Sequence, residues 1–244
     1  MSFSRYSKIA IPHLERQLEA NQEVFGRLEK WLTENVPAGK KLFVFGSGHS
    51  AALAFEVYHR AGGPSFVIPV VGDFLLPSAG PPIVRVLERT PGVAQALLAR
   101  AAPLAGEMLW LVSQSGINAA IIDLALEAKK QGLVTVAWTS LAHSAAVKSR
   151  HSTGKRLYEV CDEVVDFGGV VGDAVVEVAS DARTGPLSTL SSVFLVHSLL
   201  TEVCGKLESE GHRCVYTSVN TPEGEARNRA LEKEAAIRDP LLRG

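Results

Sequence analysis

The chain has 244 residues, 46% of them hydrophobic and 21% charged, which is the composition of an ordinary globular protein with a sizeable core. Its formal net charge of −1 argues against a nucleic-acid partner held by a basic surface. No apolar run approaches the roughly 20 residues of a membrane helix. Since Cys161, Cys204 and Cys214 lack disulfide-like spacing, we expect a cytoplasmic protein with no membrane partner.

The first segment, residues 3–36, is expected to form one or two amphipathic helices. Apolar residues recur there at helical spacing between charged and polar ones, namely Leu14, Leu18, Phe25, Leu28 and Leu32. Pro37 and Gly39 end the segment. The apolar stripe needs a partner, either the domain's own sheet or the same helix in a second subunit.

Short apolar runs then alternate with helical patterns. The runs lie at 42–45, 66–71, 108–113, 134–140 and 163–168, and the helical patterns at 50–61, 91–101, 117–130, 154–161 and 187–208. Strands that are apolar on both faces are typical of a parallel sheet covered by helices on each side. The alternation predicts an α/β doubly wound fold in a single domain, 1–244, with its core at 40–210 and a C-terminal arm at 211–244.

Two stretches rich in Gly interrupt this alternation. Residues 72–90 also contain several prolines and are expected to form an extended loop after the second strand. Residues 168–186 are expected to be similar, with a short strand at 175–179. Long loops inside a compact domain are often functional, although plain insertions are as common.

The loops that follow the first, third and fourth strands carry hydroxyl groups. They are Gly46-Ser47-Gly48-His49-Ser50, then Ser113-Gln114-Ser115-Gly116-Ile117-Asn118, and finally Thr139-Ser140. In a doubly wound sheet, ligands bind beyond the carboxyl ends of the strands, so these loops are expected to meet at one edge. Any one serine could simply cap a helix, but three such loops favour a shared polar ligand such as a phosphate. Because no Lys or Arg lies in these loops, hydroxyls and backbone amides are expected to hold it.

A second interpretation of the first loop stays open. Gly46 to Ala51 fits G-x-G-x-x-A, a variant of the dinucleotide-binding fingerprint. Its usual companion is an acidic residue at the end of the second strand, but residues 66–71 contain none and Asp73 comes late. This interpretation also leaves the hydroxyls of residues 113–118 without a role.

Four stretches together resemble the SIS (sugar isomerase) domain family, and most of all its phosphosugar-binding branch. They are "FVFGSGHSAALAFEVYHRAGG", "LVSQSGINAAIIDLALEAKKQG", "VTVAWTS" and "STGKRLYEVCDEVVDFGGVVGDA", and the resemblance runs from about residue 5 to 230. It implies a five-stranded parallel sheet of flavodoxin-like order, a small-molecule phosphosugar ligand, and a homodimer or homotetramer. Similar phosphoheptose isomerases have a longer first loop, and similar N-acetylmuramic acid 6-phosphate etherases have a different first loop and a larger C-terminal region.

The resemblance also implies a set of binding residues on the strand-end loops. Ser113, Ser115 and Asn118 would bind the phosphate, with Ser47, His49 and Ser50 contributing from the first loop. The glycines and hydroxyl-bearing residues of the strand-end loops complete this set. The predicted phosphate- and sugar-binding residues are therefore Ser47, Gly48, His49, Ser50, Ser113, Ser115, Gly116, Asn118, Thr139 and Ser140.

Candidate catalytic groups follow from the needs of aldose–ketose isomerisation, which takes a base for the carbon-bound proton and a second group for the proton on oxygen. Glu56 and His59 lie three residues apart on the helix expected at 50–61, and solvent exposure or mutual pairing is the alternative. His197 and Glu202 are candidates because similar isomerases use a late-helix histidine or glutamate, although His197 could be a buried structural histidine. Asp173 is a weaker candidate.

The expected function is therefore that of a sugar-phosphate isomerase. The alternatives are a sugar-phosphate lyase related to N-acetylmuramic acid 6-phosphate etherase, or a non-catalytic phosphosugar sensor. No cofactor is expected, and no metal site either, since the seven histidines form no ligand pair of recognisable spacing. The basic stretch 148–156 is expected to be a solvated surface.

Overall fold

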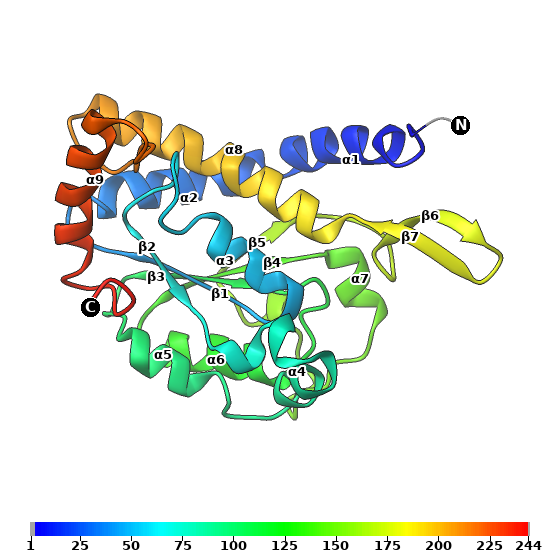
Figure 1. Cartoon of the computed structure of the whole chain (residues 1–244). Helices are drawn as coiled ribbons and strands as arrows, with labels where there is room; N and C mark the ends of the chain where they lie inside the picture. The colour runs from blue at the N-terminus through cyan, green and yellow to red at the C-terminus, as the bar shows by residue number, and fades with distance from the viewer. Residues whose placement is uncertain (1–2, 244) are drawn as a thin grey trace.

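A computed structural model describes residues 3–243, which fold around a five-stranded parallel sheet (Figure 1). The strands are β1 (Leu42–Gly46), β2 (Val67–Val70), β3 (Met108–Val112), β4 (Val134–Thr139) and β5 (Glu163–Asp166). Their order is β2-β1-β3-β4-β5, with Leu42 of β1 in register with Val67 on one side and Met108 on the other. This confirms the predicted fold class. The chain leaves β1 toward β2 and returns to β3, so the strand order reverses between the ends of β1 and β3.

Both faces of the sheet are covered by helices, as the apolar strands predict (Figure 1). One layer contains α2 (Gln22–Asn35), α3 (Ala52–Glu56) and α8 (Ser188–Ser209), and the other contains α5 (Gln95–Ala101) and α6 (Ala119–Lys130). Leu42 and Val44 pack toward the α8 side, while Phe43 and Phe45 pack toward the α6 side. The period-2 alternation of a strand therefore divides its apolar residues between two cores.

The N-terminal segment forms two helices, α1 (Ser7–Ala20) and α2, which meet at Asn21. The Asn21 amide donates to the carbonyl of Asp166 at 2.8 Å and accepts from its N–H at 3.0 Å, so it joins the helices to β5. Phe25, Leu28 and Leu32 are buried in the core with α8. The apolar stripe of α2 is therefore covered by its own domain.

Two expected helices are largely absent. The helix expected at 50–61 is replaced by the 3-10 turn η1 (Gly48–Ala51) and the short α3, because the chain then turns to pair with residues 214–216, where the Gly62 N–H bonds to the Tyr216 carbonyl at 2.8 Å. The helix expected at 154–161 is only the 3-10 turn η4 (Leu157–Glu159). There the Leu157 N–H bonds to the Gly116 carbonyl at 2.8 Å instead of to its own turn.

The two expected loops contain more regular structure than predicted. Residues 72–90 form the 3-10 turns η2 (Asp73–Leu75) and η3 (Pro77–Ala79) and the helix α4 (Pro81–Leu87), whose prolines occupy a first turn that needs no N–H donor. Residues 168–186 contain a hairpin of β6 (Ala174–Ala179) and β7 (Ala182–Pro186), which projects beside α1 (Figure 1). The expectation of an extended loop was wrong at 72–90. At 168–186 the short strand expected at 175–179 is confirmed as β6, but its partner strand β7 was not expected.

The remaining helices are α7 (Leu141–Ala146) and α9 (Pro222–Ala235). By length and composition alone, α8 could cross a membrane, and it is the one such helix within residues 3–243. Half of its apolar window is buried, however, and its buried residues belong to the core beside the sheet. We therefore assign α8 as a core helix.

Candidate functional site

A polar pocket of about 660 Å³ lies at the switch point, where β1 and β3 end. Its lining comes from the segments after β1 and β3, the end of α4, and α7 with the segment that follows it: Ser47, Ser50, Glu88, Ser113, Gln114, Ser115, Ile117, Asn118, His143, Val147, Lys148, Ser149 and Arg150. The structure thus brings five of the predicted binding residues, from two strand ends, into one hollow.

The loop after β1 depends on a glycine at its start. A Cβ atom added at Gly46 would lie 2.3 Å from the carbonyl oxygen of Ser50, which no side chain could tolerate. The Ser50 N–H in turn bonds to the Ser47 carbonyl at 3.1 Å, so η1 folds back tightly over the strand end. This turn carries the hydroxyls of Ser47 and Ser50 to the pocket wall.

The loop after β3 leads into the N-terminus of α6. Gly116 has φ +58°, and its N–H donates to Ser113 Oγ at 3.1 Å. Asn118 is the residue before α6 and lines the pocket with Ser113 and Ser115. The partial positive charge at the start of this 12-residue helix therefore lies beside three polar side chains, an arrangement that suits an anion.

Thr139 and Ser140 lie behind the pocket rather than in its lining. Both are fully buried, and Thr139 Oγ1 donates to the Gln114 carbonyl at 3.0 Å. Ser140 Oγ accepts from the His143 N–H at 3.2 Å and so caps α7. Their position fits support for the β3 loop rather than direct contact with a ligand.

Gly48 and His49 line a separate, smaller hollow of about 190 Å³ beside α4. His49 is exposed there, and Glu88 lines both this hollow and the pocket.

The pocket contains two cationic side chains, so the expectation of a site without fixed cations was wrong. Lys148 and Arg150 reach it from the segment after α7, and Arg150 Nη1 donates to Asn118 Oδ1 at 2.8 Å. The Arg150 N–H also bonds to the Ile117 carbonyl at 2.9 Å. The basic stretch 148–156 was the available signal, but only the tertiary path of the chain shows that its first residues turn toward the pocket.

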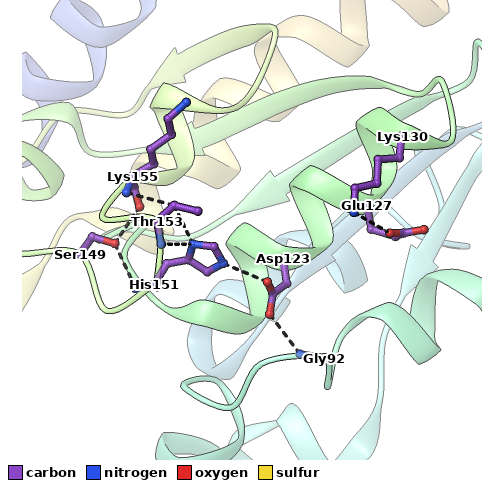
Figure 2. Close-up of polar contacts among 8 residues, drawn as sticks. All are labelled: Gly92, Asp123, Glu127, Lys130, Ser149, His151, Thr153 and Lys155. Atoms are coloured by element: carbon purple, nitrogen blue, oxygen red, sulfur yellow. Dashed lines mark hydrogen bonds and ion pairs between the residues drawn. The ribbon is translucent and has the colours of Figure 1, made fainter.

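A buried histidine holds this cationic segment in place (Figure 2). His151 Nε2 lies 2.9 Å from Asp123 Oδ1 on α6, and His151 Nδ1 lies 2.8 Å from Thr153 Oγ1. The other oxygen of Asp123 accepts from the Gly92 N–H at 3.1 Å. The Asp123–His151 pair therefore fixes residues 148–153 to the helix whose N-terminus faces the pocket.

Glu88 is a pocket residue that the sequence analysis missed. It follows α4, and its carboxylate accepts from Ser47 Oγ at 3.4 Å. Burial raises the pKa of the Glu88 carboxyl above its ordinary value, and this outweighs the lowering by the hydroxyl, amide and guanidinium groups around it. A partly buried acid with a shifted pKa inside a pocket is a candidate for a functional position.

The predicted catalytic residues lie outside the pocket lining. Glu56 and His197 face each other, with His197 Nε2 3.0 Å from Glu56 Oε1, and Arg60 donates to the same oxygen. His197 and Glu202 share a larger hollow of about 780 Å³ between α2 and α8.

Two further histidine and carboxylate candidates have structural partners. His59 lies beyond the end of α3, not on one helical face with Glu56, and pairs with Glu232 of α9 at 2.9 Å. Asp173 accepts from the N–H groups of Leu187 and Ser188 and so caps the start of α8. Within residues 3–243, no three His, Cys, Asp or Glu side chains gather as a metal site.

Comparison with known proteins agrees with this geometry. Residues 5–140, more than half of the chain, match the SIS domain family. The UPF0309 protein of Shouchella clausii (strain KSM-K16) is 34% identical over 235 residues, which cover 95% of this chain and 96% of that protein. The UPF0309 protein of Listeria innocua serovar 6a is 32% identical over 98% of both chains.

Among solved structures, a phosphoheptose isomerase from Francisella tularensis superposes with a TM-score of 0.55 at 16% identity, over 84% of this chain and all of the other. At this identity the likeness shows a shared fold. The chain therefore belongs to the SIS-domain proteins and, among them, to the UPF0309 family. This confirms the family indicated by the loops at 46–50 and 113–118.

Proposed function

We propose that the protein binds a phosphorylated sugar in the switch-point pocket and isomerises it between its aldose and ketose forms. The observation that carries the proposal is the convergence of hydroxyl-bearing loops, a helix N-terminus and two cations on one hollow. A small anion with several acceptor oxygens fits this combination of donors. Membership of the SIS-domain family and the fold shared with a phosphoheptose isomerase support the same ligand class.

The phosphate would lie on the loop 113–118. Ser113, Ser115 and the amide of Asn118 would donate to its oxygens, together with Ser47 and Ser50 across the pocket. Arg150 donates to Asn118 Oδ1, so this amide donates through its NH₂ group, with one hydrogen toward Glu88 and the other toward a ligand. Lys148 and Arg150 would balance the charge of the phosphate.

The sugar would extend from the phosphate along α3 toward Glu56. Glu56 lies six residues after Ser50, which corresponds to about 9 Å along a helix. In this proposal Glu56 takes the proton from C2 and returns it to C1, and His197, 3.0 Å from Glu56, handles the proton on the adjacent oxygen. The assembly into dimers or tetramers, with sites near subunit contacts, stays a prediction of the family resemblance.

The first test is thermal melting against phosphosugars, their unphosphorylated parents and NAD(P). A ligand at about 100 times its dissociation constant adds roughly 2.7 kcal/mol to stability, so binding is visible as a raised Tm. We expect a shift with certain phosphosugars only. A shift confined to the dinucleotides would instead support the fingerprint interpretation of residues 46–51.

The second test follows proton exchange at C2 in D₂O by NMR with the phosphosugar that binds. Replacing Glu56 by Gln should keep binding while it slows exchange by a factor of about 10² or more. Glu127→Gln is a matched control, because Glu127 lies on the outer part of α6 and pairs with Lys130 and Gln131. Exchange at the wild-type rate in E56Q would mean that Glu56 is not the base, and binding without exchange in the wild type would favour a sensor.

A further inference from the structure

The pocket lining contains the carboxylate of Glu88, which is not expected in a pocket that binds only phosphate. The other polar groups of the lining are hydroxyls, amides, a histidine and two cations, all of which can face an anion. An acidic side chain among them repels a phosphate that comes close. Its presence therefore calls for a second part of the ligand with which a carboxylate interacts favourably.

Glu88 is held firmly at this position. Its own carbonyl oxygen accepts from the N–H of Ala120 in the first turn of α6 at 3.1 Å, which ties the end of α4 to the start of α6, directly after the β3 loop. Its carboxylate oxygen Oε2 accepts from Ser47 Oγ at 3.4 Å, which ties it to the β1 loop. The carboxylate thus lies between the two loops that are assigned to the phosphate.

Within residues 3–243, Glu88 forms no direct ion pair, although the charges of Arg89 and Arg150 lower its pKa from a distance. The guanidinium of Arg150 donates to Asn118 Oδ1 at 2.8 Å, and its main-chain N–H to the Ile117 carbonyl. A phosphate is therefore drawn to the side of the pocket formed by Arg150, Lys148 and residues 113–118. The neutral, hydroxyl-rich part of the same ligand is left facing Glu88, and carboxylates accept strong hydrogen bonds from hydroxyls.

We propose that Glu88 accepts hydrogen bonds from the hydroxyl groups of the sugar and thereby makes the pocket select phosphosugars over inorganic phosphate. This inference rests on the proposed function, since it assigns a role within the same pocket. It makes Glu88 a specificity-determining residue with two effects: attraction of the sugar and repulsion of a bare phosphate. The partial burial of the carboxyl, which raises its pKa, strengthens the hydrogen bonds that it accepts.

Calorimetric titration of the wild type and Glu88→Gln tests this, with inorganic phosphate, fructose 6-phosphate, ribose 5-phosphate and sedoheptulose 7-phosphate as ligands. Glutamine keeps the size of glutamate and an oxygen for Ser47, and thermal melting confirms that the variant folds. Glu127→Gln again serves as the control, since it removes one negative charge from α6 outside the pocket lining.

In the wild type, at least one phosphosugar should bind more tightly than inorganic phosphate. In E88Q that preference should fall by roughly tenfold or more, because the sugar loses a charged acceptor while phosphate loses a repelling neighbour. In E127Q it should remain. An unchanged preference in E88Q, or a wild type that binds phosphate and phosphosugars equally well, overturns the role of Glu88. A wild type that binds none of the four ligands refutes the proposed function itself, and the inference with it.

Discussion

At the scale of single residues, Gly116 is the position on which the proposed phosphate loop depends most. Its φ is +58°, a left-handed conformation that favours glycine, and a Cβ atom there would lie 3.0 Å from Leu157 Cβ and 3.2 Å from Thr139 Oγ1. Gly116→Ala should therefore destabilise the protein by about 1–2 kcal/mol from backbone strain and by roughly 1–3 kcal/mol more from crowding. Urea unfolding measures the loss.

Gly154→Ala is the matched control for this substitution. Gly154 has φ +72°, but a Cβ atom there would meet nothing within 4 Å. It should show the strain alone, so that the difference between the two variants isolates the crowding. Equal losses in the two variants would mean that Thr139 and Leu157 do not confine the loop.

The residues of the pocket differ in how far the sequence predicts them. Ser47, Ser113 and Ser115 follow strands directly, and parallel strands bring their carboxyl ends to one edge, so a local pattern locates them. Glu88 and Arg150 come from segments that return to the pocket only through tertiary contacts with α6 and the β3 loop. No periodicity or spacing in the sequence indicates that these two segments fold back to the pocket.

At the scale of secondary-structure elements, a buried histidine docks α1 onto the fold. His13 Nε2 lies 3.1 Å from the Phe167 carbonyl and 3.0 Å from Ser191 Oγ, at the end of β5 and on α8. Burial lowers the pKa of His13, although the Phe167 carbonyl acts in the opposite direction. As the pH falls, histidine in the unfolded chain takes up a proton before His13 in the folded protein does. The contribution of neutral His13 to stability is therefore fully present above the ordinary histidine pKa, and it is lost as the pH falls from there through the lower pKa of the folded state.

We therefore expect wild-type protein to lose stability relative to His13→Gln as the pH falls from about 7.5 to 5.5, which spans the ordinary histidine pKa of about 6.5. The two proteins share every other titrating group, so their difference in urea midpoint isolates His13. A difference that stays constant across this pH range would contradict the assignment.

The sequence predicts whether a segment is a helix or a strand where its hydrophobic pattern is long. The predicted ends of a helix are wrong where tertiary hydrogen bonds replace those within the helix. Residues 117–130 form α6 nearly as expected, because their apolar face packs on the sheet for three turns. Residues 50–61 have a helical pattern too, yet the helix stops at Glu56, since the backbone at Gly62 and Gly63 pairs with Tyr216. That partner is about 150 residues away in the sequence, beyond the reach of any local rule.

At the scale of the whole molecule, the two cores share one sheet and should unfold together. Both cores are built on the same five strands, so loss of either helix layer leaves one apolar face of the sheet in water and destabilises the strands on which the other core rests. The three tryptophans, Trp31, Trp110 and Trp138, all belong to the α8 side, where the rings of Trp110 and Trp138 lie 4.9 Å apart. Tryptophan fluorescence therefore reports one side, while far-UV circular dichroism reports all helices.

A cavity made on the opposite side tests this coupling. Leu124 of α6 is fully buried in the core that lacks tryptophan, and Leu124→Ala should cost about 2–5 kcal/mol. If the chain is a single domain, the urea midpoints by fluorescence and by circular dichroism should coincide in the wild type and fall by the same amount in the variant. A fluorescence midpoint that L124A leaves unchanged would show that the two layers unfold independently, and the single-domain prediction would be wrong.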